Sequence, residues 1–236
     1  MKAVIMAGGK GTRLFPLTEN LPKPMVKIID KPVLECVINL LKKHDIKDIA
    51  ITLGYLPDRI ISYFGTGENL GVNITYYIED IPLGTAGSVK RAENFFDGDF
   101  LVMSGDAYSE IDLKRAIAYH KSKGSLFTVI AQPHPNPVGL GVLDIDFENR
   151  IVDFKEKPGT SKPGLINTGI YVVNKRILSL IPDGFYDFGK DLLPRLIGTA
   201  YACLDYSYWS DIGTLPSYYE TNKYLSIRAA SSQPVI

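Results

Sequence analysis

The chain has 236 residues, of which 45% are hydrophobic, enough for one large domain with a substantial core. Lys and Arg together number 26, as do Asp and Glu, so the formal net charge is zero. A neutral chain has no overall basic field to hold nucleic acid or an anionic membrane surface, so any phosphate binding must be local. No apolar run approaches the ~18 residues of a membrane span, and the N-terminus lacks a signal-peptide pattern.

The cysteine content points to a reducing compartment. Cys36 and Cys203 are far apart in the sequence and belong to no CxxC or Cys/His group, which argues against a zinc site or a disulfide framework. We therefore expect a cytoplasmic protein with neither nucleic-acid nor membrane partners, and a homo-oligomer is left open.

Buried strands and helical segments alternate through the first half of the chain. Short apolar runs predict strands at 3–6, 48–53, 72–78 and 100–103. Helices are expected from Pro32, from Pro57, and from an N-cap at Asp112 to about residue 123. This alternation predicts an α/β fold, a Rossmann-like three-layer α/β/α arrangement around a mixed, mainly parallel sheet.

The second half changes to antiparallel signals. Residues 141–145 and 151–155 flank a turn and predict a hairpin, and 165–173 is a further strand, so a small antiparallel addition is expected. The proline-rich stretch 133–137 predicts a short rigid loop. Residues 1–228 are expected to form a single domain, and the small, polar stretch 229–236 to fray.

A glycine-rich stretch follows the first strand. Gly8, Gly9 and Gly11 would let backbone N–H groups approach phosphate oxygens without interference from a β-carbon. Leu14 stands where a dinucleotide fingerprint needs its third glycine, and no Gly-Lys pair is followed by the Ser or Thr of a Walker A loop. Taken as a bare glycine cluster, the stretch predicts a tight turn about as well as a phosphate site.

The longer pattern is more specific. Residues 7–18, followed by Pro22-Lys23-Pro24, resemble the signature of the sugar-1-phosphate nucleotidyltransferase family. The resemblance implies that Arg13 and Lys23 neutralise the triphosphate and the leaving pyrophosphate, which suits a forked guanidinium and a point charge on a stiffened backbone. It also implies nucleotide contacts from Ala7, Gly8, Gly9, Gly11, Thr12 and Arg13.

Residues 79–87 resemble the nucleotide-base loop of the same family. The resemblance implies that Glu79, Pro82, Gly84 and Thr85 contact the nucleotide. The alternative is an ordinary Pro/Gly loop in which Thr85 caps the following helix.

Two segments resemble the family's magnesium-binding motifs. One is Ser104-Gly105-Asp106, just past a strand end where open α/β sheets bind ligands, and the other is residues 209–214. The resemblance implies that Asp106 and Asp211 hold Mg²⁺. Trp209 in the second segment is expected to pack in the core.

Segments 156–158 and 167–171 are similar to the parts of the family that bind the sugar and its phosphate. The residues implied in sugar-phosphate binding are Gly141, Glu156, Lys157, Asn167 and Thr168. A charged hairpin end is the alternative explanation for 156–158. His44, His120 and His134 match none of these motifs and are expected at the surface.

Taken together, the resemblance implies an Mg²⁺-dependent enzyme with catalytic residues Arg13, Lys23, Asp106 and Asp211. The pattern looks most like the catalytic domain alone of mannose-1-phosphate guanylyltransferases and their manno-heptose relatives. It therefore favours GTP with mannose 1-phosphate or manno-heptose 1-phosphate. The alternatives are a glucose-1-phosphate uridylyl- or thymidylyltransferase and a catalytically silent regulatory subunit that senses a nucleotide sugar.

Overall fold

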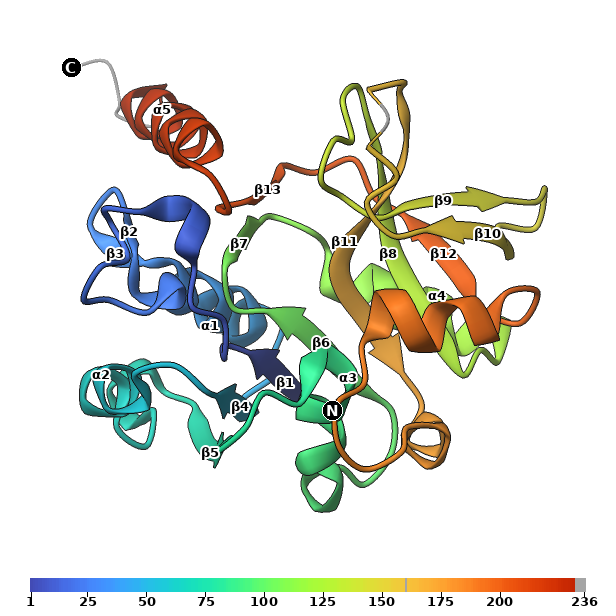
Figure 1. Ribbon diagram of the computed structural model, residues 1–236, viewed down its shortest axis with the longest axis horizontal. Coiled ribbons are helices and arrows are strands. Elements are labelled where there is room, and N and C mark those ends of the chain that lie inside the picture. Colours follow the sequence, from blue (N-terminus) through green and yellow to red (C-terminus); the bar gives the residue numbers. More distant parts are fainter. Residues whose placement is uncertain (160, 232–236) are drawn as a thin grey trace.

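A nine-stranded sheet forms the centre of the computed structural model, which describes residues 1–159 and 161–231 (Figure 1). The main strand order is β10-β9-β11-β6-β1-β4-β5, and β8 joins β11 to β12. The strands of the first half are β1 (Lys2–Met6), β4 (Asp48–Leu53), β5 (Asn73–Ile78) and β6 (Phe100–Ser104). Those of the second half are β8 (Phe127–His134), β9 (Val142–Ile145), β10 (Ile151–Lys155), β11 (Gly164–Val173) and β12 (Tyr201–Leu204).

The strands of the first half are parallel to one another; β1, β4 and β6 are buried on both faces, whereas β5 has exposed and half-buried residues only. β1 lies between β4 and β6, and β5 extends the sheet beyond β4. Side chains alternate between faces, so Ala3 and Ile5 enter one core cluster and Val4 enters the other. Burial on both faces explains why β1, β4 and β6 are nearly continuous apolar runs in the sequence.

Helices cover both faces of the sheet. One face is packed by α1 (Val33–Lys43), α2 (Pro57–Phe64) and α4 (Leu113–Lys123). The other is packed by α3 (Gly84–Arg91) and by short helical segments between residues 175 and 196. The predicted three-layer α/β/α architecture with a mixed sheet is confirmed.

The second half is mainly antiparallel, as predicted. β9 and β10 form the expected hairpin, and β11 pairs antiparallel with β6, β8 and β9. The expected loop at 133–137 is shorter than predicted, because β8 continues to His134 and its exposed Pro133 pairs with Leu165. Proline is tolerated there because it lies near the strand end.

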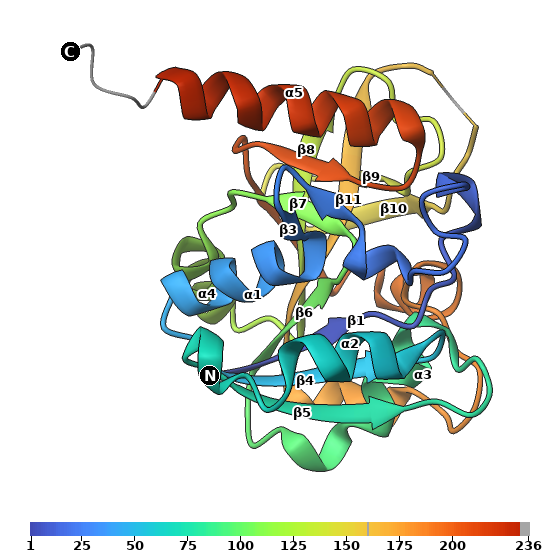
Figure 2. The same cartoon turned by 90° about the vertical axis from the view of Figure 1, so that its left-hand side faces the viewer.

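Two short sheets lie beside the central one. β2 (Lys27–Ile28) pairs with β3 (Lys31–Pro32), and β7 (Ala107–Ser109) pairs with β13 (Trp209–Asp211). The last helix, α5 (Leu215–Ser231), runs above β13 and β7 (Figure 2). It extends past the expected start of the tail at 229, and residues 232–236 lie outside the described residues.

His120 is a correction to the sequence analysis. It was expected at the surface, yet it is 1% exposed, and its Nδ1 lies 2.8 Å from Thr128 Oγ1. The cause is its place on α4, where it continues the buried face of Leu113 and Ala116 at helical spacing. His44 and His134 are half-buried. Within residues 1–159 and 161–231, no helix has the length and apolar character needed to cross a membrane.

Candidate active site

Two adjoining cavities open where the parallel strands end. The larger, about 570 Å³, is lined by the glycine-rich loop and by residues 79–85. The smaller, about 250 Å³, is lined by residues 139–141, 156–157 and 167–169. They share the residues Met6, Thr85, Ser104, Asp106 and Asp187. Asp106 therefore stands at the junction between the two cavities.

A lysine and two aspartates meet at this junction. Lys23 Nζ lies 2.6 Å from Asp106 Oδ2 and 2.9 Å from Asp211 Oδ1, and the Lys23 side chain is 8% exposed. Gly11 makes room for the lysine, because a β-carbon on Gly11 would lie 2.6 Å from Lys23 Cβ. The glycine-rich loop thus seats Lys23 as well as lining the larger cavity.

The charges in this cluster stabilise one another. Burial lowers the pKa of the Lys23 ammonium, but Asp106 and Asp211 outweigh burial and raise that pKa overall. Burial raises the pKa of the Asp106 carboxyl, but Lys23 and a hydrogen bond from the Ser104 hydroxyl lower it overall. The Lys23 ammonium and the Asp106 carboxylate are therefore both charged at neutral pH.

The pairing of β7 with β13 explains how residues so far apart in sequence meet. Asp211 lies opposite Ala107, the residue after Asp106, and Ile212 N donates to Asp106 O at 3.1 Å. A β-carbon on Gly213 would lie 2.6 Å from Asp211 Oδ2. The glycine therefore leaves room for the Asp211 carboxylate.

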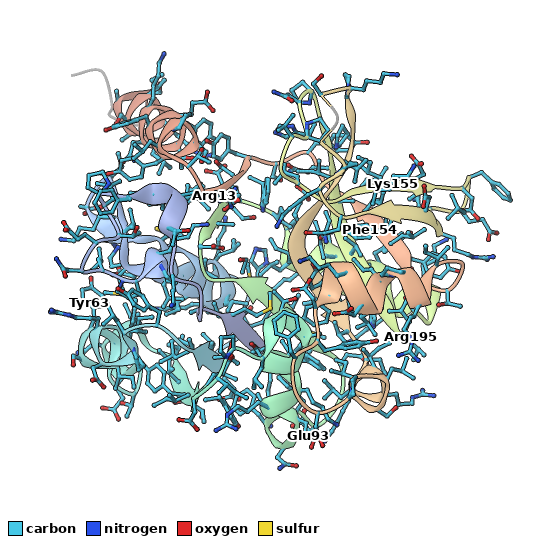
Figure 3. All side chains as sticks on the ribbon, viewed as in Figure 1. Arg13, Tyr63, Glu93, Phe154, Lys155 and Arg195 are labelled. Atoms are coloured by element: carbon cyan, nitrogen blue, oxygen red, sulfur yellow. The ribbon has the colours of Figure 1, made fainter. Side chains whose placement is uncertain are left out.

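Arg13 lies on the other side of the Asp211 carboxylate. Its Nη2 is 4.0 Å from Asp211 Oδ2, and its side chain is 59% exposed. Figure 3 shows Arg13 in the middle of the molecule, between the N-terminal segment and the strands of the second half. Because most of the guanidinium faces solvent, it is free to bind phosphate oxygens.

The two aspartates also fit a magnesium ion. Mg²⁺ in proteins is usually held by one or two carboxylates, with phosphate oxygens and water completing an octahedron. Asp106 and Asp211 already bracket one cation, the Lys23 ammonium. Residues 1–159 and 161–231 contain no group of three or more His, Cys, Asp or Glu side chains placed to hold a metal. The donor set therefore suits an ion shared with substrate phosphates.

The predicted nucleotide-binding residues are only partly brought together. Gly8, Gly9, Glu79, Pro82, Gly84 and Thr85 line the larger cavity, and Arg13 lines the smaller one. Ala7 is 2% exposed and packs in the core, and neither Ala7, Gly11 nor Thr12 lines either cavity.

Glu79 presents one free carboxylate oxygen. Its Oε2 accepts a hydrogen bond from Leu83 N at 3.2 Å. Its Oε1 is buried and has no hydrogen-bond partner among the residues that the structure describes. A buried unpaired acceptor is costly, so this oxygen is suited to receive a donor from a bound molecule.

Thr85 does not cap α3, which corrects the alternative explanation of this loop. Helix α3 has no side-chain cap, and Tyr186 O instead accepts from the backbone N–H groups of Ala86 and Gly87, at 2.9 and 3.0 Å. The Thr85 hydroxyl accepts from Phe188 N at 2.8 Å. A segment a hundred residues away thus holds the start of α3.

The five predicted sugar-phosphate residues all line the smaller cavity: Gly141, Glu156, Lys157, Asn167 and Thr168. Lys157 has a φ of 47°, a left-handed conformation that costs energy outside glycine and that is found at functional sites. Its Nζ lies 3.4 Å from Glu156 Oε1. The Thr168 hydroxyl donates to Ile130 O and is 2% exposed, so it serves the fold.

Some residues that line the two cavities were not among the predicted site residues. Trp209 packs against the core, as expected, but it is half-buried and also lines the smaller cavity, and its indole N–H has no partner among the described residues. Phe185 lines the larger cavity, Asp187 both, and Gly189 the smaller one. Asp187, two residues before Gly189, is the one local signal, since its Oδ1 caps the next turn by accepting from Gly189 N.

The fold and the site are those of an α/β enzyme in which two cavities meet at a lysine and two carboxylates. Residues 2–227 match the family described as nucleotidyl transferase. The chain therefore belongs to the nucleotidyltransferase family of enzymes, as its sequence resemblance implied.

Several curated proteins and solved structures are similar to the chain. The D-glycero-alpha-D-manno-heptose 1-phosphate guanylyltransferase of Campylobacter jejuni is 35% identical, over 93% of this chain and 97% of the relative. The UTP–glucose-1-phosphate uridylyltransferase of Synechocystis is 38% identical, over 93% of this chain and 62% of the relative. Among solved structures, HddC from Yersinia pseudotuberculosis complexed with GMP-PN has a TM-score of 0.85 at 32% identity, covering 95% of this chain and 99% of HddC.

Other relatives include mannose-1-phosphate guanyltransferases at 34% identity, in agreement with the resemblance seen in the sequence. Most of these curated relatives are longer, and the chain spans between 51% and 62% of their length.

Proposed function

We propose that the chain transfers a nucleoside monophosphate from an NTP to a sugar 1-phosphate and releases pyrophosphate. The observation that supports this most is the cluster of Lys23, Asp106 and Asp211 at the junction of the two cavities. A nucleotide in the larger cavity and a sugar phosphate in the smaller would meet there.

The proposed mechanism depends on position and charge. The sugar-phosphate oxygen attacks the α-phosphorus in line while pyrophosphate leaves, so no covalent nucleophile is needed. Arg13 and Lys23 neutralise the leaving group, whose charge grows in the transition state. Asp106 and Asp211 would hold Mg²⁺, which would supply further charge neutralisation at the reacting phosphate.

The smaller cavity offers a separate set of contacts for the sugar phosphate. Lys157 is 58% exposed there and is available to bind the phosphate. Glu156 accepts hydrogen bonds from sugar hydroxyls, and the side-chain amide of Asn167 both donates and accepts.

The cytoplasmic location and the assembly into a homo-oligomer remain predictions from the sequence.

We favour GTP as the nucleotide because of Glu79. Guanine presents two adjacent donors, N1–H and the 2-amino group, and an ionised carboxylate can only accept. The free Oε1 of Glu79 receives one of them, and Oε2, which has a second lone pair beside its bond from Leu83 N, receives the other. Adenine would instead place its N1 acceptor against the carboxylate. Mannose 1-phosphate or manno-heptose 1-phosphate is the favoured acceptor, in line with the guanylyltransferase relatives.

A UTP-dependent glucose-1-phosphate enzyme is the second candidate. It is favoured by the 38% identity to the Synechocystis uridylyltransferase. Uracil has a single N3–H donor that the free oxygen of Glu79 would also accept. The two candidates therefore differ in how many base donors Glu79 must satisfy.

The test is pyrophosphate release from GTP, UTP, dTTP and ATP against mannose, manno-heptose, glucose and N-acetylglucosamine 1-phosphates. Glu79→Gln should reduce the GTP preference by about 1–3 kcal/mol, the scale for a poorly matched buried donor. Glu93→Gln is the control, since Glu93 pairs with Lys90 and lies at the edge of the molecule away from Arg13 (Figure 3). A wild-type preference for UTP or dTTP would overturn the guanylyl assignment, and no turnover with any pair would overturn the proposed activity.

A further inference from the structure

Two glycines face the same carboxylate oxygen in the smaller cavity. A β-carbon placed on Gly189 would overlap Glu156 Oε2 and lie 3.0 Å from Glu156 Cδ. A β-carbon on Gly141 would lie 3.1 Å from the same Oε2. Gly141 precedes β9, whereas Gly189 belongs to the π-helical segment η6 (Phe188–Leu192). The Glu156 carboxylate thus sits in a slot between two separate parts of the chain.

Backbone conformation does not explain why residues 141 and 189 are glycine. Neither Gly141 nor Gly189 has the positive φ that favours glycine. The backbone N–H of Gly189 already donates to Asp187 Oδ1 at 3.1 Å, so it has no free donor for a ligand. What Gly189 contributes is the absence of a side chain next to Glu156.

The atom that Gly189 leaves room for is the end of a flexible side chain. An alanine there would fit the backbone and push the Glu156 carboxylate out of the slot. At Gly141 the ring of Phe154 would also be hit, at 2.8 Å, so a substitution there disturbs packing as well. Gly189 is therefore the cleaner of the two positions to test.

We propose that Gly141 and Gly189 form a slot that fixes the Glu156 carboxylate, and that Gly189 is a positioning residue for sugar recognition. It acts through Glu156, whose side chain is 23% exposed to the cavity. The inference rests on the proposed function, in which Glu156 accepts hydrogen bonds from sugar hydroxyls. A displaced carboxylate loses those bonds without any change in the nucleotide cavity.

The first measurement is the kinetics of Gly189→Ala with the NTP and sugar 1-phosphate of highest kcat/KM in the substrate matrix. We expect the KM of the sugar 1-phosphate to rise about tenfold or more, the scale of a lost hydrogen bond to a charged group. The KM of the NTP should stay unchanged. Gly98→Ala is the matched control, because Gly98 has an ordinary φ and no atom near its β-carbon position.

The second measurement places Gly189→Ala in a Glu156→Ala background. With the carboxylate gone, the added methyl group has nothing to displace, so the double variant should match Glu156→Ala alone. A further loss in that background would show that Gly189 acts by another route and would overturn the slot. Wild-type kinetics for Gly189→Ala alongside a defective Glu156→Ala would overturn it too.

The Glu156→Ala variant also tests the premise of the slot, which is that the smaller cavity binds the sugar 1-phosphate. If Glu156→Ala leaves the sugar 1-phosphate KM unchanged, the assignment of the sugar cavity fails, and the slot fails with it.

Circular dichroism and thermal unfolding check the fold of each variant. If Gly189→Ala is unfolded, recovery of the fold in the double variant supports crowding by Glu156, and failure of both variants to fold overturns it.

Discussion

Replacing Lys23 with methionine tests the charge cluster at the cavity junction. The change keeps the length of the side chain and removes the cation between Asp106 and Asp211. Removing one partner of a buried ion pair costs about 3–5 kcal/mol. Both aspartate side chains are 29% exposed here, and solvent reduces the cost to about 2–3 kcal/mol.

Thermal unfolding in EDTA measures this cost. At about 2–4 °C per kcal/mol for a chain of this size, Lys23→Met should lower Tm by roughly 5–10 °C. Lys114→Met is the matched control, because it breaks a 2.7 Å pair with Asp45 whose side chains are 61% and 76% exposed. An exposed pair is screened by solvent and contributes little to stability, so the control should leave Tm close to that of the wild type.

The pH dependence of stability should have opposite directions in the wild type and in Lys23→Met. In the wild type the pKa of Asp106 is lowered, so its contribution to stability is complete above about pH 4 and is lost as the pH falls through that lowered value. Without Lys23 the burial of Asp106 would raise its pKa. The variant should then gain stability as the pH falls from neutral toward 4.

Activity completes the comparison. Lys23→Met should lower kcat by about 10²–10³, the scale of a lost charge-stabilising group in a transition state. Mg²⁺ should raise the Tm of the variant more than that of the wild type, because no ammonium competes for the two carboxylates. A Tm equal to that of Lys114→Met, with kcat within about threefold of wild type, would refute the role of Lys23 in both stability and catalysis.

Three further outcomes are expected. Asp211→Asn should keep the fold and raise the Mg²⁺ concentration needed for half-maximal rate by about tenfold, as measured by metal titration; an unchanged requirement would remove Asp211 from the metal site. Lys157→Ala should raise the KM of the sugar 1-phosphate and leave the KM of the NTP unchanged. The opposite result would show that the two substrates are assigned to the wrong cavities. Burial lowers the pKa of His120, so its contribution to stability is present above about pH 6.5 and declines on acidification. In denaturant unfolding, the free energy of unfolding of His120→Gln should lack this decline between about pH 6.5 and the lowered pKa.

The parts of the fold predicted from sequence are those specified by local patterns. β1, β4 and β6 are continuous apolar runs because both of their faces are buried, and α1 shows its buried face at helical spacing. β8 was missed because prolines at its end are typical of a loop. β7 and β13 are three residues each and exist only because they pair across the chain.

The predicted catalytic residues share one property, which is a charged side chain that a sequence motif can reveal. Lys23, Asp106 and Asp211 are of this kind, and the structure brings them together. Tyr186 contributes a backbone oxygen to α3, and Gly189 contributes the lack of a side chain. Neither leaves a recognisable pattern, because any residue has a carbonyl and glycines occur in every turn.

The glycines of the site therefore differ in what they accommodate. Gly84 has a φ of 71°, and a β-carbon there would lie 2.6 Å from the backbone oxygen of Tyr186, so a substitution must move the main chain that holds α3. Gly189 faces only the movable end of Glu156. Residues 184–189 thus contact residues 84–87 through backbone atoms and leave room for the Glu156 side chain at the smaller cavity. For that reason, a change at the first contact should alter stability, and a change at the second should alter substrate recognition with little effect on stability.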